Sequence, residues 1–113
     1  MHIVNALAAA ESPNPHGVSA RELLSTEHAQ VVMVTLQPGE ALKLHRTAVD
    51  VFFYALEGEG IVEIGGEQQT IVRDMLVESP VRIPHRLLNR SDAVFRCLVV
   101  KTPRPPANST QLL

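Results

Sequence analysis

The chain has little of what ties a protein to a membrane, a nucleic acid or a disulfide scaffold. Its 113 residues include one cysteine, Cys97, so neither an internal disulfide nor a CxxC redox or metal motif can form. Ten basic and twelve acidic residues are scattered to a net charge of −2, and no basic face indicates a nucleic acid or anionic membrane partner. No stretch approaches the roughly 20 apolar residues of a membrane span.

Targeting signals and common catalytic motifs are also missing. The opening residues MHIVNALAAA have no basic leader and no full-length apolar run, so they do not match a signal peptide. We expect a soluble, cytoplasmic protein. There is no G-x-S-x-G nucleophile motif and no glycine-rich phosphate loop. No carboxylate pair stands out for general acid–base catalysis.

What the sequence does contain predicts an all-β, antiparallel fold. Short runs rich in β-branched and aromatic residues recur about every ten residues, with turn residues between them, as in sandwiches and barrels. Gly65-Gly66 fits a two-residue hairpin, because both central positions favour positive φ. The expected strands are Ser19–Thr26 (which also fits a helical turn, although we favour an edge strand), Gln30–Leu36, Ala41–Arg46, Asp50–Leu56, Ile61–Ile64, Glu67–Val72, Met75–Glu78, His85–Leu88 and Val94–Lys101, with His2–Leu7 as a further candidate.

These strands divide the chain into three parts. Residues 1–28 form an N-terminal extension with edge strands, and residues 29–101 form the barrel. Residues 102–113 form a flexible proline-rich tail, which we expect to leave the core because it is polar and contains few groups to bury.

The strand Asp50–Leu56 predicts a dimer. If Val51, Phe53 and Ala55 point into the barrel, the alternation of a strand turns three large apolar side chains outward, namely Phe52, Tyr54 and Leu56. Such a face needs a cover, which is either the N-terminal segment or a second subunit. We favour a homodimer.

Two segments resemble the two-part signature of the cupins, G-x5-H-x-H-x3-E-x6-G followed by P-x-G-x2-H-x3-N. The matching residues are Gly39, His45 and Gly58 in the first part, and Pro80, His85 and Asn89 in the second. The resemblance covers about residues 30 to 101 and is specific as to fold. It implies a small single-domain, RmlC-like cupin with a double-stranded β-helix, or jelly roll, of the kind that often dimerises through its sheets.

The resemblance also implies where a metal would bind. Cupin metal sites usually take two histidines and a glutamate from the first part and one histidine from the second. This chain keeps His45 and His85, but Thr47 and Val51 stand at the other two positions, whereas a firm divalent site usually takes three or more protein ligands. We therefore expect either no metal or a weakly held divalent ion (Zn, Ni, Fe, Mn or Cu). Asp50, one residue before the glutamate position, would need a bulge to face inward.

Inward-facing positions of the barrel predict a ligand-binding cavity. The candidate lining residues are His45, Thr47, Val51, Phe53, His85, Phe95 and Cys97. Each has a structural alternative: the histidines as neutral hydrogen-bonded residues, Thr47 as the partner of a strand neighbour, and Cys97 as a small apolar side chain.

Residues near the second motif are less informative. Arg82 and Arg86 flank His85 and either bind an anion or are simply solvated. Asn89 is expected to cap a turn. The remaining histidines, including His16, have no matching spacing and receive no role.

Three functions stay open from the sequence. The first is a protein that binds a small molecule in its barrel, with His45 and His85 as polar anchors. The second is a metal-dependent cupin enzyme, of dioxygenase or isomerase type, with a reduced two-histidine site. The third is an interaction module with a closed cavity. We favour the first, with no nucleic-acid or membrane partner.

Overall fold

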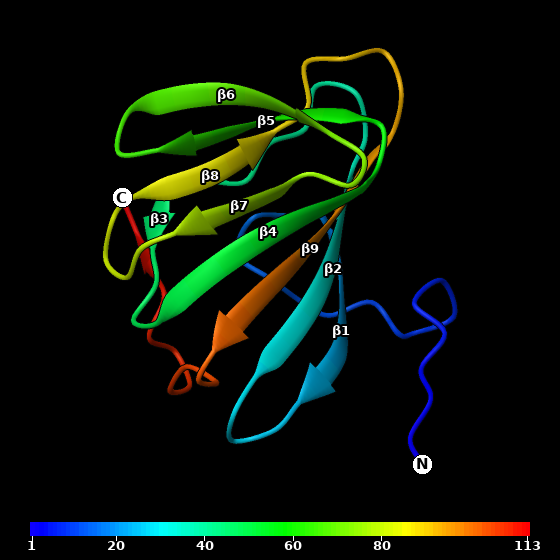
Figure 1. The fold of residues 1–113 in the computed structure, drawn as a ribbon, viewed down its shortest axis with the longest axis vertical. Helices are drawn as coiled ribbons and strands as arrows, with labels where there is room; N and C mark the ends of the chain where they lie inside the picture. The colour runs from blue at the N-terminus through cyan, green and yellow to red at the C-terminus, as the bar shows by residue number, and fades with distance from the viewer.

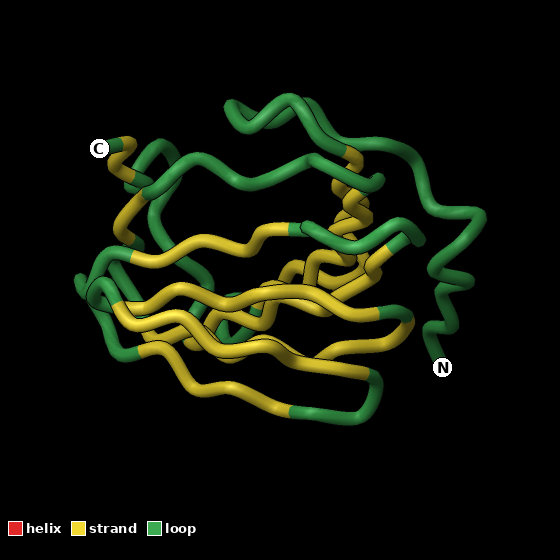
Figure 2. Tube along the Cα trace, turned by 90° about the horizontal axis from the view of Figure 1, so that it is seen from above, coloured by secondary structure: helices red, strands yellow, loops and turns green.

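Ten strands make up the chain, and most of them lie where β-branched and aromatic residues are concentrated (Figure 1). The structure is a computed structural model that describes residues 1–113, and no segment of it is helical (Figure 2). The strands are β1 (Ser19–Ser25), β2 (Gln30–Leu36), β3 (His45–Arg46), β4 (Asp50–Glu57), β5 (Glu59–Ile64), β6 (Glu67–Val72), β7 (Leu76–Ser79), β8 (His85–Leu88), β9 (Phe95–Thr102) and β10 (Gln111–Leu112).

The strands form two five-stranded antiparallel sheets. The first has the order β1-β2-β9-β4-β7, and the second has the order β10-β3-β8-β5-β6. Neighbours in each sheet are far apart in sequence, as when β9 lies between β2 and β4. The two sheets enclose the apolar core between them, and this arrangement confirms the predicted all-β double-stranded β-helix.

The inner face of the first sheet is filled in layers from one end. At the closed end lie Leu36 and Phe95, both fully buried. The next layer contains Val34, Cys97 and Ala55, which face one another across three strands. The layers beyond these, around Val32 and Val99, approach the open end of the barrel.

The predicted alternation of β4 is confirmed. Val51, Phe53 and Ala55 are at most 1% exposed, whereas the side chains between them are only half-buried. The predicted hairpin is confirmed as well: Gly65 and Gly66 both have positive φ, and β5 and β6 pair on either side of them.

Two predicted strands differ from the structure. His2–Leu7 is not a strand, because Asn5 closes a turn there by accepting the amide hydrogens of Leu7, Ala8 and Ala9. Ala41–Arg46 is a strand only at His45–Arg46. The backbone amide of Lys43 donates to the side chain of His16 in a loop, so this segment does not pair along its whole length.

The C-terminal segment also differs from the expectation that it leaves the core. After the prolines the chain turns back, and Gln111 and Leu112 pair with Arg46 and His45 of β3. The amide of Leu113 donates to the carbonyl of Leu44. The end of the chain thereby covers the free edge of β3, which would otherwise present unpaired backbone groups.

The N-terminal segment does not cover the outer face of β4. It lies beside β1, where the Arg21 guanidinium donates to the carbonyls of Leu7 and Ala9 (Figure 1). The outer side chains of β4 are therefore left partly open in the single chain. The structure contains no helix of the length and hydropathy that a membrane crossing requires.

Candidate functional site

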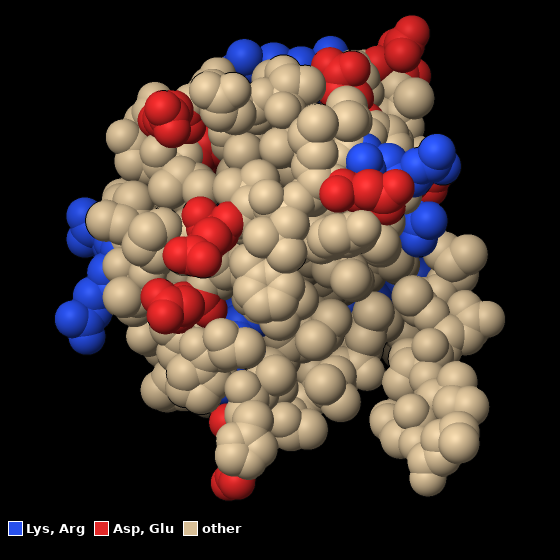
Figure 3. Space-filling view, in the orientation of Figure 1, with Lys and Arg blue, Asp and Glu red and all other residues tan.

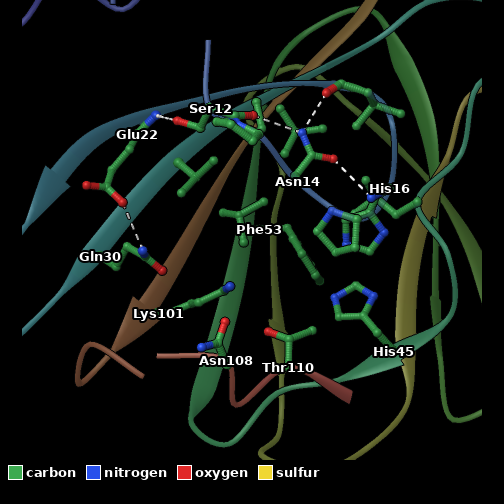
Figure 4. Close-up of a pocket in the computed structure, with 18 residues that line it drawn as sticks. Ser12, Asn14, His16, Glu22, Gln30, His45, Phe53, Lys101, Asn108 and Thr110 are labelled. Carbon is green, nitrogen blue, oxygen red and sulfur yellow. Dashed lines mark hydrogen bonds between the residues drawn. The ribbon is translucent and has the colours of Figure 1, made fainter. Parts of the chain in front are cut away.

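A cavity of about 440 Å³ opens at the end of the barrel opposite Leu36 and Phe95 (Figure 4). One wall is the inner face of β1, β2, β9 and β4, and the loop around residues 12–18 and the tail around residues 108–110 form the rim. The apolar lining residues are Pro13, Pro15, Val18, Ala20, Val32, Val34, Leu42, Phe53 and Val99. The polar ones are Ser12, Asn14, His16, Glu22, Gln30, His45, Lys101, Asn108 and Thr110.

Two histidines from neighbouring strands of the second sheet meet at the inner end of this cavity. His45 of β3 and His85 of β8 are paired across the sheet, and their Nε2 atoms lie 3.1 Å apart. Nδ1 of His45 lies 2.7 Å from the carbonyl oxygen of Lys43, and Nδ1 of His85 lies 2.7 Å from the Ser79 hydroxyl. The chain of contacts therefore runs from β7 of one sheet to the segment before β3 of the other.

The contacts assign the proton positions in both rings. A carbonyl oxygen only accepts, so Nδ1 of His45 donates and its Nε2 has no proton when the ring is neutral. Nε2 of His85 then donates to Nε2 of His45. Nδ1 of His85 accepts from the Ser79 hydroxyl. All four ring nitrogens have partners with both histidines neutral.

Burial keeps the rings neutral. His85 is 1% exposed, and its burial lowers its pKa to about 3. Repulsion from Lys101, and from His45 whenever that ring is protonated, acts in the same direction. Burial also lowers the pKa of His45, although the hydrogen bond to the Lys43 carbonyl acts in the opposite direction. At neutral pH the pair contributes polarity without charge.

A third histidine joins this site from the N-terminal loop. The ring of His16 lies 4.7 Å from that of His45, centroid to centroid. Its Nδ1 accepts the amide hydrogen of Lys43 at 2.9 Å, so the neutral ring carries its proton on Nε2, which has no partner in the chain. Burial and the neighbouring cations lower the pKa of His16 to about 4.

The residues predicted to line a cavity separate into different layers of the barrel. His45 and Phe53 line the cavity. His85 lies behind them, with its ring 5.3 Å from that of Phe53. Phe95 and Cys97 are fully enclosed in the deeper layers.

The other two predicted residues lie outside the cavity. Val51 is 1% exposed and does not line it. Thr47 is buried beside a smaller hollow and donates its hydroxyl hydrogen to the Val49 carbonyl at 3.1 Å. The hydroxyl is therefore satisfied within the loop between β3 and β4, and not by a neighbouring strand.

The thiol of Cys97 is not available for chemistry. It is fully buried, and burial raises its pKa to about 12. It therefore acts as a small apolar side chain of the core.

The charged residues near the motifs also have structural roles. Arg86 forms a two-pronged ion pair with Glu63, with both N–O distances 3.2 Å. The exposed Asp50 carboxylate accepts the backbone amide hydrogen of Val81. Asn89 caps its turn as predicted, accepting from Ser91 and donating to the carbonyls of Leu36 and Ala93.

Of the nine polar residues that line the cavity, sequence reasoning predicted only His45, and the missed residues with ionisable nitrogen groups are His16 and Lys101. Lys101 follows Phe95, Cys97 and Val99 at steps of two on β9, so strand alternation places it on the inner face. The signal was present in the sequence. His16 had no such signal, because its contact is with a backbone amide 27 residues away.

The donors present do not fit a resident metal. His45 and His85 supply two imidazoles whose facing nitrogens already bond to each other. No group of three or more histidine, cysteine, aspartate or glutamate side chains is placed to hold an ion. Protein metal sites usually need more ligands than this.

The neutral histidines predict a specific dependence of stability on pH. The unfolded chain protonates each histidine near pH 6.5, but the folded chain keeps His16 and His85 neutral down to about pH 4 and 3. The free energy of unfolding should therefore fall as pH is lowered from 6.5 toward 4, by up to about 1.4 kcal/mol per pH unit for each such histidine. Urea unfolding at a series of pH values measures this slope.

The variants His85→Gln and His16→Gln should each flatten the pH dependence. His28→Gln is the matched control, since His28 is exposed on a turn and should leave the slope unchanged. Equal slopes in the wild type and in both test variants would contradict the assignment of neutral histidines.

Comparison with known proteins identifies the family. The model of the cupin domain matches residues 32–101. The crystal structure of TT1209 from Thermus thermophilus is 32% identical, with a TM-score of 0.81, and the match covers 93% of this chain and all of that one. No curated protein is significantly similar in sequence.

Two further structures share the fold at lower identity. The polyketide cyclase RemF from Streptomyces resistomycificus is 16% identical with a TM-score of 0.84, and the match covers 100% of this chain and 85% of that one. An RmlC-like cupin from Shewanella frigidimarina is 14% identical with a TM-score of 0.79, and the match covers 91% of each chain. With the two-sheet fold and the His45–His85 pair, these matches show that the chain belongs to the cupins and shares its fold with an RmlC-like cupin.

Proposed function

We propose that this protein binds a small organic molecule in the cavity at the open end of its barrel. The observation that supports this proposal is the composition of the cavity, with apolar walls from β2, β9 and β4 and a few polar groups at His16, His45 and Lys101. A volume of about 440 Å³ falls in the usual range for ligand pockets, about 300 to 1,000 Å³. The apolar walls supply affinity, and the polar groups orient the ligand.

Both nitrogens of His45 are bonded, to Lys43 and to His85, so among the three histidines only His16 has a free ring nitrogen to anchor a ligand. Both nitrogens of His85 bond to Ser79 and His45, so His85 acts by holding the ring of His45 in place. His16 lines the cavity, and its Nε2–H has no partner in the chain. The molecule therefore meets one fixed imidazole ring and one hydrogen-bond donor.

Filling the cavity with a larger side chain should weaken the binding of a small molecule there. We expect Val32→Trp to weaken the binding of benzamide, an uncharged aromatic probe, by at least about tenfold, because the indole occupies the space between β2 and β9. Amide shifts in NMR titrations measure both the affinity and the residues touched. In the wild type the shifts should concentrate on cavity-lining residues.

The matched control is Val72→Trp, at an exposed valine of β6 on the other sheet, which should bind the probe normally. If benzamide produced no shifts at millimolar concentration, or the same shifts in Val32→Trp, the cavity would not be a binding site. The alternative of an interaction module with a closed cavity would then gain support.

A metal-dependent reaction is the second candidate function. What favours it is the approach of two imidazole nitrogens to 3.1 Å at the positions where the family resemblance implies metal ligands. Two imidazoles make an incomplete donor set, and we assign no step of a reaction to a metal there.

Metal loading tests this second candidate. After incubation with Zn²⁺, Ni²⁺, Mn²⁺, Fe²⁺ or Cu²⁺ and dialysis, we expect the untagged protein to retain well below one ion per chain, because only two protein ligands are available. Elemental analysis gives the ratio. Near-stoichiometric metal that is lost in the double variant His45→Ala, His85→Ala would instead favour the metal-dependent candidate.

We also propose that the protein works in the cytoplasm, because a chain with one buried free cysteine suits a reducing compartment.

We further propose that the protein is a homodimer through the outer face of its first sheet. Two apolar rows cross this face. They are Val31, Val100 and Phe52, and Met33, Leu98 and Tyr54, of which Met33 is already buried in the single chain beside the Arg96 guanidinium. Figure 3 shows an uncharged area at the centre of this side of the molecule, with acidic side chains to its left and a cluster of acidic and basic side chains to its upper right. An antiparallel sheet that is apolar on both faces is normally covered on both.

A charge placed in this face should separate the dimer. We expect Phe52→Glu and Tyr54→Lys to halve the mass in solution or to unfold the protein, because each places a charged side chain in an apolar interface. Light scattering after size-exclusion chromatography gives the mass. Val72→Glu, on the other sheet, is the control and should stay dimeric. Native stability with an unchanged mass in both test variants would refute the interface.

A further inference from the structure

Lys101 is the cation of the cavity, and its position follows from the filling of the barrel. It is the last inward-facing residue of β9, two residues beyond Val99, at the level of Gln30 on β2. The layers toward Phe95 are sealed, so the open space begins at the Lys101 end of β9. Figure 4 shows its side chain pointing from β9 into the cavity, on the side where Phe53 and His45 lie.

This lysine has no partner within the chain. The ion pairs of the protein involve four other cationic side chains, Arg21, His28, Arg86 and Arg96. No side-chain hydrogen bond reaches the ammonium group either, and no nitrogen is sealed off without a partner, so Nζ is open to the cavity. Burial lowers the pKa of Lys101, which shows that the folded protein holds this charge at a cost.

The one carboxylate that lines the cavity does not neutralise it. Glu22 is exposed, and its Oε2 accepts a hydrogen bond from the Gln30 amide at 3.0 Å, but it forms no ion pair with Lys101. The imidazoles of His16 and His45 are neutral. The interior of the cavity therefore carries one unpaired positive charge.

The groups around this charge define what would bind there. We propose that Lys101 binds the carboxylate of an organic monoanion, whose apolar body lies against Phe53, Val32 and Val99. The free Nε2–H of His16 provides a second donor for the anion or for another oxygen of the same molecule. A single cation with one neutral donor matches a monoanion better than a phosphate dianion, which would keep an uncompensated charge in a half-buried site.

This inference rests on the proposed cavity function and specifies the ligand class. It is tested with matched pairs of molecules of the same shape, one an anion and one neutral, benzoate with benzamide and hexanoate with hexanamide. We expect the wild type to bind each carboxylate about tenfold more tightly than its amide, as a charge-assisted hydrogen bond provides. Lys101→Met should lose this preference and bind each carboxylate no more tightly than its amide.

The chain provides a close control, because its only other lysine is Lys43. That side chain is exposed and does not line the cavity, and its contacts with His16 and His45 are made by backbone atoms. Lys43→Met should therefore keep the full preference for carboxylates. Lys101→Gln is a second test variant in case the methionine variant does not fold, and it should also lose the preference.

A second readout observes the lysine itself. With only two lysines, ¹³C-methylation of the amines gives two lysine NMR signals beside that of the terminal amine, and benzoate should raise the titration midpoint of the Lys101 signal while leaving that of Lys43 unchanged. Equal affinities for carboxylates and amides in the wild type would overturn the carboxylate site but leave the cavity as a binding site. A preference for carboxylates that persists in Lys101→Met would also overturn it. If neither member of either pair bound, the cavity function would be overturned, and the carboxylate site with it.

Discussion

The chain of hydrogen bonds from Ser79 through His85 and His45 to the Lys43 carbonyl is the constraint on which the site depends. It connects β7 of one sheet with the segment before β3 of the other, at the level where the packed core gives way to open space. Because each link uses a specific nitrogen, one arrangement of protons satisfies the whole chain with neutral rings. The histidine pair therefore fixes the floor of the cavity without adding charge to it.

The same Lys43 segment connects this floor to the rim. Its carbonyl accepts from His45 and its amide donates to His16, so one peptide segment positions two imidazoles from distant parts of the chain. The C-terminal tail completes the rim by pairing with β3, next to His45. Segments that looked peripheral in the sequence, the loop before residue 19 and the proline-rich tail, thus decide the shape of the opening.

Most of the fold could be predicted from the sequence, but of the seven residues predicted to line the cavity only His45 and Phe53 do so. Alternation along β4, the Gly65-Gly66 hairpin and the Asn89 cap follow from local backbone rules, which do not depend on the rest of the chain. How deep a residue lies in the barrel, in contrast, does depend on the rest of the chain. Phe95 and Cys97 face inward as expected, yet they are sealed in the core. They lie toward the closed end of the barrel, and no sequence pattern indicates which end is closed. The role of His16 rests on a backbone contact that has no sequence pattern.

The balance of charge in the cavity explains why its lysine is its most informative residue. Three histidines approach one another there, and if they were protonated the site would hold several like charges in a half-buried space. Burial and the hydrogen bonds keep them neutral, so the ammonium group of Lys101 remains as the charge that the surrounding protein does not compensate. A half-buried charge with no partner in its own chain is costly, and a partner from outside would remove that cost. The arrangement that makes the histidines poor metal ligands is therefore the one that leaves the lysine free to select an anion.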